Sequence, residues 1–373
     1  MGVPGEPNDD CLVELHAQAL ARAGVALDFF DAHTHMGSND PDGVTATAEE
    51  ILAGLDRAGH RRALIFPAQE PTGYPPFNDA ALAAASASGG RLQALARLDP
   101  NTGDAALAEG ERALAAGAVG FKLHPRSDAF DLPHPVVERI VALAHEHHAP
   151  VLFHAGRGFP GLGEEVAVLA RRYRRASLIL AHAGISDLGH LAEVVAEAPN
   201  IFFDTAWWQV SDMLMLFTSV PPGRILYASD MPYGSGRFAS LSDLRCAFEV
   251  GLSSDALVSI AGAQIDRIVR GEDPIDLGPA PGRSVLGERD LVAERGIAYL
   301  AAGCMAMFRG ADAIEPLSLA RLALRDSRRP VVVQADALVE QAIELTAANP
   351  PESRAGIYPV VAAQLVLGTP SAS

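Results

Sequence analysis

The chain has few cysteines, and their spacing cannot support a covalent framework. Its 373 residues include three cysteines, Cys11, Cys246 and Cys304, and no two of them form a C-x-x-C pair. An odd and widely spaced set provides neither a disulfide scaffold nor a thiolate zinc site. We therefore expect a protein of a reducing compartment, the cytoplasm.

The sequence also lacks an excess of positive charge and a long apolar run. It has 29 Lys and Arg against 46 Asp and Glu, a formal net charge of -17, which disfavours nucleic acids and anionic membranes as partners. The start, MGVPGEPNDDC, does not resemble a signal peptide. The longest apolar run, residues 296–308, is shorter than the roughly 20 residues that cross a bilayer. These absences predict a soluble protein whose partner is a small-molecule substrate.

What the sequence does have is a repeated alternation of short apolar runs and helical stretches. The runs cover residues 26–31, 63–67, 92–98, 118–123, 150–153, 178–181, 201–204 and 224–228. Ala-, Leu- and Glu-rich stretches with helical spacing lie between them, for example 47–58, 104–116 and 135–148. Strands separated by helices pair in parallel. Eight such units predict an α/β fold, a closed (β/α)8 TIM barrel, with an open doubly wound sheet as the alternative. No P-loop is present to favour that alternative.

Composition divides the chain into three parts. Residues 1–25 are expected to form a helical lead-in, 26–270 the barrel, and 271–373 a linker with a C-terminal helical extension. The linker GEDPIDLGPAPG is rich in Pro and Gly, and helices are expected over 289–308, 316–325, 335–348 and 360–367. The final GTPSAS is expected to fray. The extension would cover one end of the barrel or form an oligomer interface, as in a homodimer.

Histidine and aspartate recur where the expected strands end. In chain order these residues are His33 and His35 in FFDAHTHMG, Lys122 and His124 in GFKLHPR, His154 in LFHAGRG, His182 in ILAHAG and Asp230 in LYASDMPYG. Barrel enzymes carry their reactive groups at the C-terminal ends of the strands. A single histidine usually has no ligand role, but several that converge on one barrel end predict a metal site.

The first strand supplies two of these groups at the spacing that metal binding needs. Residues i and i+2 of a strand project to one face, so His33 and His35 can both point into the barrel mouth. A third imidazole and a carboxylate would complete a nitrogen and oxygen ligand set suited to zinc, manganese or iron. An ion with a remaining water would lower the pKa of that water and polarise a substrate carbonyl.

Taken together, the motifs resemble the amidohydrolase superfamily, specifically its amidohydrolase-2 branch, which includes metal-dependent hydrolases and aminocarboxymuconate-semialdehyde-type decarboxylases. DAHTH, GFKLHP, LFHAG, AHAG and SDMPYG stand in family order within residues 26–270. The resemblance implies that His33, His35 and His154 are metal ligands. It implies that Asp230 is a ligand or the carboxylate that deprotonates the water, and that His182 is a base or acid beside it.

The same resemblance implies one divalent ion, with Zn2+ favoured over Mn2+. Some superfamily relatives carry a carbamylated lysine that bridges two metals, at a position near Lys122. Because His124 lies nearer the mouth on the same strand, a binuclear site with Lys122 is the less favoured alternative.

Further side chains near the strand ends are candidates for substrate binding. They are His124, Arg126, Arg157, Trp207 and Tyr233. An arginine fork suits a substrate carboxylate, and a tryptophan offers a flat apolar wall.

The leading functional prediction is hydrolysis of an ester, lactone or amide bond in a small carboxylated metabolite by a metal-activated water. Asp230 would accept the proton of that water, and His182 would stabilise the developing oxyanion. A non-oxidative metal-dependent decarboxylase, a carbon–carbon lyase, is the alternative on the same residues. A barrel without catalysis that serves as a binding protein is the second alternative.

Overall fold

A barrel of parallel strands forms the larger part of the molecule. The computed structural model describes residues 9–41, 43–156 and 161–372. Within them, one eight-stranded sheet runs in the order β1 to β8, and every neighbouring pair is parallel. The strands are β1 (Phe30–Met36), β2 (Arg62–Pro67), β3 (Leu92–Arg97), β4 (Gly120–Leu123), β5 (Pro150–Phe153), β6 (Ser177–Leu180), β7 (Ile201–Asp204) and β8 (Ile225–Leu226).

The backbone that follows β8 returns to β1 and closes the barrel. The amide of Ala32 donates to the carbonyl of Tyr227 at 3.0 Å, and the amide of His35 donates to that of Met231 at 2.8 Å. The predicted (β/α)8 fold is confirmed, and the open sheet is excluded. The first strand begins at Phe30 rather than at the predicted Ala26, because its register with β2 starts at the pair of Phe30 and Arg62.

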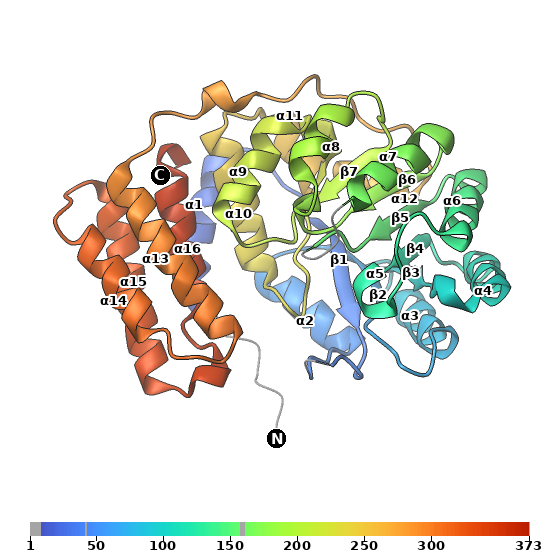
Figure 1. Cartoon of the computed structure of the whole chain (residues 1–373), viewed down its shortest axis with the longest axis horizontal. Helices are drawn as coiled ribbons and strands as arrows, with labels where there is room; N and C mark the ends of the chain where they lie inside the picture. The colour runs from blue at the N-terminus through green and yellow to red at the C-terminus, as the bar shows by residue number, and fades with distance from the viewer. Residues whose placement is uncertain (1–8, 42, 157–160, 373) are drawn as a thin grey trace.

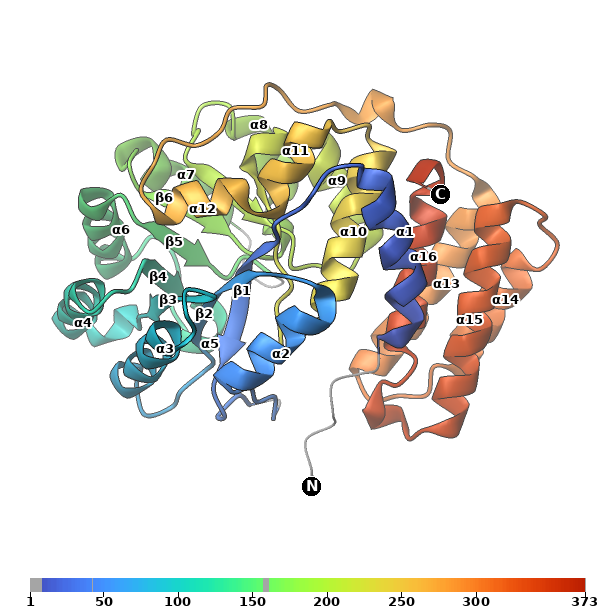
Figure 2. The same ribbon diagram turned by 180° about the vertical axis from the view of Figure 1, so that it is seen from behind.

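Helices cover the outside of the barrel (Figures 1 and 2). They are α2 (Ala48–Ala58), α3 (Pro75–Ala87), α4 (Asp104–Ala115), α5 (Pro125–Asp128), α6 (Pro135–His147), α7 (Leu162–Arg172), α8 (Leu188–Val194), α9 (Val210–Ser219), α10 (Gly236–Glu249), α11 (Ser254–Val258) and α12 (Gln264–Val269). Local signals set their ends. At the start of α2, Thr47 and Glu50 form a reciprocal capping box, and Gly59 ends the helix with φ of 72°.

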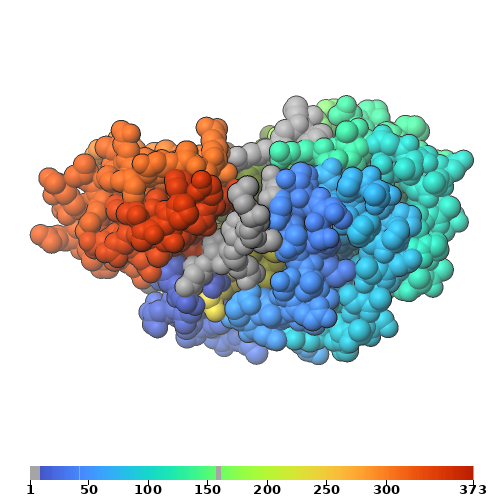
Figure 3. All heavy atoms as spheres, turned by 90° about the horizontal axis from the view of Figure 1, so that it is seen from below, coloured from blue at the N-terminus to red at the C-terminus, as the bar shows by residue number. Residues whose placement is uncertain are grey.

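The C-terminal helices pack against the side of the barrel rather than across one end of it. They are α13 (Leu291–Phe308), α14 (Ile314–Leu324), α15 (Pro330–Ala348) and α16 (Ile357–Gly368), and we call them the helical unit. The buried helix α16 contacts α9 and α10, while α1 (Val13–Ala23) lies beside α10 (Figures 1 and 2). Seen from below, the helical unit and the first β/α units form two lobes (Figure 3).

The end of the chain is packed, so the expected frayed tail is wrong for residues 368–372. The buried Arg245 of α10 donates from Nε to Thr369 Oγ1 and from Nη2 to the Thr369 carbonyl, both at 2.9 Å. A buried guanidinium needs such acceptors, and the tail provides them.

Helix α13 begins two residues later than the predicted helix 289–308 and extends beyond the apolar run of residues 296–308. By length and composition its 18 residues could cross a membrane, and 39% of them are buried inside the protein. Its partners are α14 and α16. Residues such as Leu300 and Cys304 are fully buried in this packing, which accounts for much of its apolar character.

Two buried histidines, one in α1 and one in the turn between α2 and β2, contact α10 and the residue that follows β8. His16 Nε2 lies 2.9 Å from Ser240 Oγ, and His60 Nδ1 lies 3.0 Å from the Tyr227 hydroxyl. Burial lowers the pKa of His16 to about 4 and that of His60 to about 3. Unfolded histidine titrates near ~6.5, so the stability that the neutral rings contribute is complete above that pH. It is lost as the pH falls toward the folded-state values.

Replacing His60 should therefore flatten the pH dependence of stability. Between pH 7 and pH 5, we expect His60→Gln to lose about 2 kcal/mol less unfolding free energy than the parent does. Urea unfolding at both pH values measures this difference. His147→Gln, on the exposed face of α6, is the control that should keep the parent's dependence. Parallel curves for His60→Gln and the parent would show that the pKa of His60 is not lowered.

Candidate active site

A one-residue irregularity in β1 aims its two histidines into the barrel. Asp31 pairs with Ala63 and Thr34 pairs with Ile65, so β1 has one more residue than β2 between these two pairs. Phe30 and Ala32 join the inner apolar cluster before it. After it, the alternation is inverted, and His33 and His35 lie on the inner face. The prediction that the two side chains share one face is confirmed.

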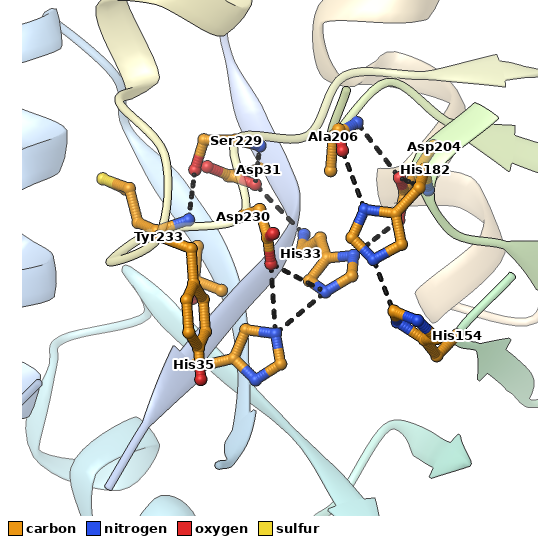
Figure 4. A network of polar contacts seen from close by, with 12 residues as sticks. Asp31, His33, His35, His154, His182, Asp204, Ala206, Ser229, Asp230 and Tyr233 are labelled. Atoms are coloured by element: carbon orange, nitrogen blue, oxygen red, sulfur yellow. Dashed lines mark hydrogen bonds and ion pairs between the residues drawn. The ribbon is translucent and has the colours of Figure 1, made fainter. Parts of the chain in front are cut away.

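Three side chains meet at the mouth of the barrel (Figure 4). The Nε2 atoms of His33 and His35 lie 3.0 Å apart. Asp230 Oδ1 lies 3.3 Å from Nε2 of His33 and 3.2 Å from Nε2 of His35. Among the described residues, these three form a group whose ligand atoms all lie within 4.8 Å of one another.

The protonation of these side chains suits a divalent cation. His33 Nδ1 lies 2.7 Å from Asp204 Oδ2, and this contact assigns the ring proton to Nδ1 and leaves a lone pair on Nε2. Burial lowers the pKa of His33 and of His35 well below the usual value, so both rings are neutral. Neutral imidazoles and a carboxylate are the ligands that Zn2+ and Mn2+ accept.

His154 and His182 form the facing wall of the site. His182 Nδ1 lies 2.8 Å from the Ala206 carbonyl, and His182 Nε2 lies 3.0 Å from His154 Nδ1. The carbonyl can only accept, so this order assigns a proton to Nδ1 of each ring. His154 Nε2 then carries a lone pair, is shielded from solvent and has no hydrogen-bond partner among the described residues. An orphaned acceptor of this kind fits the predicted ligand role of His154.

Both ring nitrogens of His182 are therefore engaged in hydrogen bonds, one with Ala206 and one with His154. In this arrangement its ring holds His154 in place, and its predicted role as an acid or base stays a prediction. The rings of His182 and His33 lie 5.1 Å apart, so the two walls belong to one site.

Asp204 of β7 and Asp31 of β1 support the site, and neither was predicted as a site residue. Asp204 accepts from the amides of His182 at 2.8 Å and Ala206 at 3.1 Å, in addition to its contact with His33. Asp31 accepts from the amides of His33 and Ser229, both at 3.0 Å, and so ties β1 to the segment after β8. Burial raises the pKa of both carboxyls. Their strand positions were the available signal, because Asp204 ends β7 and Asp31 precedes the His-x-His pair.

Asp230 is held in an unusual backbone conformation. Its φ of 60° is rare for a residue with a side chain. The Asp230 amide donates to the His33 carbonyl at 3.0 Å, and its own carbonyl accepts from Tyr233 at 2.8 Å. Burial raises the pKa of the Asp230 carboxyl, which makes it a stronger base than an ordinary aspartate.

The candidates for substrate binding occupy different parts of the mouth. His124 stacks on His154 with ring centroids 3.9 Å apart. The Trp207 ring lies 6.3 Å from that of His182. The Tyr233 ring lies 5.1 Å from that of His35, and its hydroxyl donates to Asp40 at 2.6 Å. Arg126 is exposed on α5. The predicted Arg157 lies outside the described residues.

Lys122 lies in β4 and is fully enclosed by the barrel. It is fully buried, and its Nζ has no hydrogen-bond partner among the described residues, while the Phe66 ring centroid lies 4.7 Å away. Burial lowers its pKa. The less favoured binuclear site with Lys122 stays a prediction.

Asp204→Asn is expected to weaken metal binding without removing a ligand. The amide could no longer accept from His33 with a full charge, and loss of such a supporting contact typically costs 10- to 100-fold in affinity, roughly. Competition with a fluorescent chelator measures the dissociation constant for Zn2+. Asp326→Asn, at a site that is 90% exposed, is the control, and an unchanged constant in Asp204→Asn would contradict the support that we assign to Asp204.

Comparisons with known proteins agree with this geometry. The family described as Amidohydrolase matches residues 30–250. No curated protein sequence matches the chain. We describe three of the solved structures that are similar in fold. 2,6-dihydroxybenzoate decarboxylase, complexed with 2,6-dihydroxybenzoate, is 14% identical with a TM-score of 0.53, over 66% of this chain and 99% of that one.

The other two come from named bacteria. 4-oxalomesaconate hydratase from Rhodopseudomonas palustris is 16% identical with a TM-score of 0.50, over 65% of this chain and 96% of that one. 5-carboxyvanillate decarboxylase from Novosphingobium aromaticivorans, complexed with manganese and 4-hydroxy-3-methoxy-5-nitrobenzoic acid, is 13% identical with a TM-score of 0.50, over 66% and 96%. At these identities the likeness establishes the fold.

Proposed function

We propose, from the premise that this chain belongs to the amidohydrolase family, that it is a metal-dependent hydrolase of an ester, lactone or amide bond in a small carboxylated metabolite. The observation that carries the proposal is the convergence of His33, His35 and Asp230 within 4.8 Å. His154 lies outside that group, and its orphaned Nε2 would be the fourth donor to a bound ion. A Zn2+ or Mn2+ ion bound there would polarise the substrate carbonyl and acidify a water.

The protein's own side chains would transfer the proton and orient the histidine ligands. Asp230 Oδ1 faces both histidines of β1, so its carboxylate accepts the proton of the attacking water and can return it to the leaving group. Asp204 keeps the His33 proton on Nδ1, and His182 does the same for His154. Both contacts hold the Nε2 lone pairs toward the mouth.

Decarboxylation is the second candidate, because two of the similar solved structures are decarboxylases of hydroxylated benzoates. On this chain it would use the same side chains, with Asp230 delivering a proton to carbon rather than accepting one from water. Hydrolysis therefore releases an acid, whereas decarboxylation releases CO2, and this difference distinguishes the two reactions.

The test uses the full chain loaded with Zn2+ or Mn2+ and two substrate panels. Carboxylated aryl esters and lactones are followed by acid release, and 2,6-dihydroxybenzoate and 5-carboxyvanillate by CO2 release. We expect acid release without CO2. Release of CO2 from the second panel, with no turnover of the first, would replace hydrolysis by decarboxylation. No turnover of either panel by the metal-loaded protein would favour the binding protein.

A further inference from the structure

The protein has two tryptophans, Trp207 and Trp208, and both lie between β7 and α9. They are half-buried, with ring centroids 5.8 Å apart. Trp207 faces the site, at 6.3 Å from the ring of His182, and its Nε1 donates to Asp212 Oδ2 at 2.7 Å. The pair therefore forms an aromatic wall on one side of the mouth.

The far side of this wall rests on the helical unit. The Trp208 ring lies 5.5 Å from that of Phe308, the last residue of α13. Arg354, which precedes α16, lies over the ring of Phe308, with its guanidinium carbon 5.7 Å from the centroid of that ring. Its Nη2 donates to the Phe308 carbonyl at 3.3 Å. Phe308 is thus held in place by Arg354 of the helical unit, and its ring contacts the segment between β7 and α9.

A second contact fixes the same loop from α16. A Cβ at Gly368 would come within 2.6 Å of Val210 Cγ2, so the Val210 side chain packs against the backbone of α16 only because Gly368 has no side chain. Val210 is the first residue of α9, and only Gln209 separates it from the tryptophan pair. The helical unit therefore holds the tryptophan segment at Trp208 and at Val210.

We propose that the helical unit completes the substrate site, with Phe308 as the positioning residue that sets the wall of Trp207 and Trp208 and thereby selects a substrate with a planar ring. This inference deepens the proposed function and rests on it for the location of the substrate. The family match ends at residue 250, so Trp207 and Trp208 lie within the matched part of the chain, whereas Phe308 and the rest of the helical unit lie outside it. Flat rings stack on indole with an energy that a non-planar ring of equal charge does not recover.

The test measures ligand binding, and it needs no turnover. Tryptophan fluorescence is the readout because both tryptophans of the chain belong to the wall. Tryptophan fluorescence of the Zn2+-loaded full chain is titrated with benzoate and with cyclohexanecarboxylate, which share a charge and a similar size. Benzoate should quench the emission and bind more tightly than cyclohexanecarboxylate. Phe308→Ala should weaken benzoate binding by roughly threefold to tenfold, and Phe308→Leu by less. Leu291→Ala, exposed at the other end of α13, should match the parent.

The outcomes separate this proposal from the proposed function. Equal benzoate affinity in Phe308→Ala and the parent, or equal affinity of the parent for the two probes, would overturn the inference even if the protein hydrolyses esters. Conversely, the expected titrations would stand if hydrolysis failed. With a substrate that the enzyme converts, Phe308→Ala should raise KM and leave kcat within about twofold. The variant loses binding energy that is equal in the ground state and the transition state.

Discussion

The His33→Ala/His35→Ala double variant is expected to lose its bound metal and to fall in activity by about a thousandfold or more. The two Nε2 atoms lie 3.0 Å apart and face Asp230, so the variant removes two of the proposed donors and leaves Asp230 and His154. The contribution of a metal to the transition state amounts to several kcal/mol, and each ~1.4 kcal/mol changes the rate tenfold.

Plasma mass spectrometry on protein purified without chelator provides the direct measurement. We expect about one equivalent of Zn2+ or Mn2+ in the parent and a small fraction of that in the variant. His147→Ala/His190→Ala removes two exposed histidines and should keep both metal and activity. A parent without metal, or a variant that retains the parent's content, would contradict the site. About two equivalents would instead support the binuclear alternative with Lys122.

Periodicity made the barrel and the front of the site predictable. Strand β5 matched its predicted residues Pro150–Phe153, and β7 matched Ile201–Asp204, because short buried strands between polar turns leave little freedom in where they begin and end. The i, i+2 rule placed His33 and His35 on one face. The extra residue in β1 that makes this face the inner one depends on pairing with β2, and pairing is not visible in the spacing of one strand.

The supporting residues were harder to foresee, because their roles arise from contacts between distant segments. Asp204 reaches His33 across 171 positions of sequence, and it stands in no motif that distinguishes it from other strand-end aspartates. Phe308 looked like one apolar residue of a helix without chemistry. Its contact with Trp208 exists only because α16 packs the helical unit against α9, and no pattern along the chain encodes that docking.

The remaining large effect concerns Asp230, which we propose both as a ligand of the metal and as the base. Asp230→Asn keeps an oxygen near the two histidines of β1 but removes the negative charge and the capacity to accept a proton. At saturating Zn2+ we expect kcat to fall by about 100- to 10,000-fold, the usual contribution of a positioned acid or base. The burial that raises the pKa of Asp230 makes this proton transfer more favourable, so little of the activity should survive.

Kinetics across a range of Zn2+ concentrations separate the two roles of Asp230. If excess metal restores the parent's kcat in Asp230→Asn, the carboxylate serves only as a ligand, and the proton must go elsewhere, with His182 the first alternative. If metal binds in Asp230→Asn and kcat stays low, the carboxylate is the base. Asp326→Asn, at its exposed position, should match the parent at every Zn2+ concentration. Because His182 already has both ring nitrogens in hydrogen bonds, we expect the second result. The Asp230 side chain is 22% exposed, and its Oδ1 lies beside Nε2 of both β1 histidines.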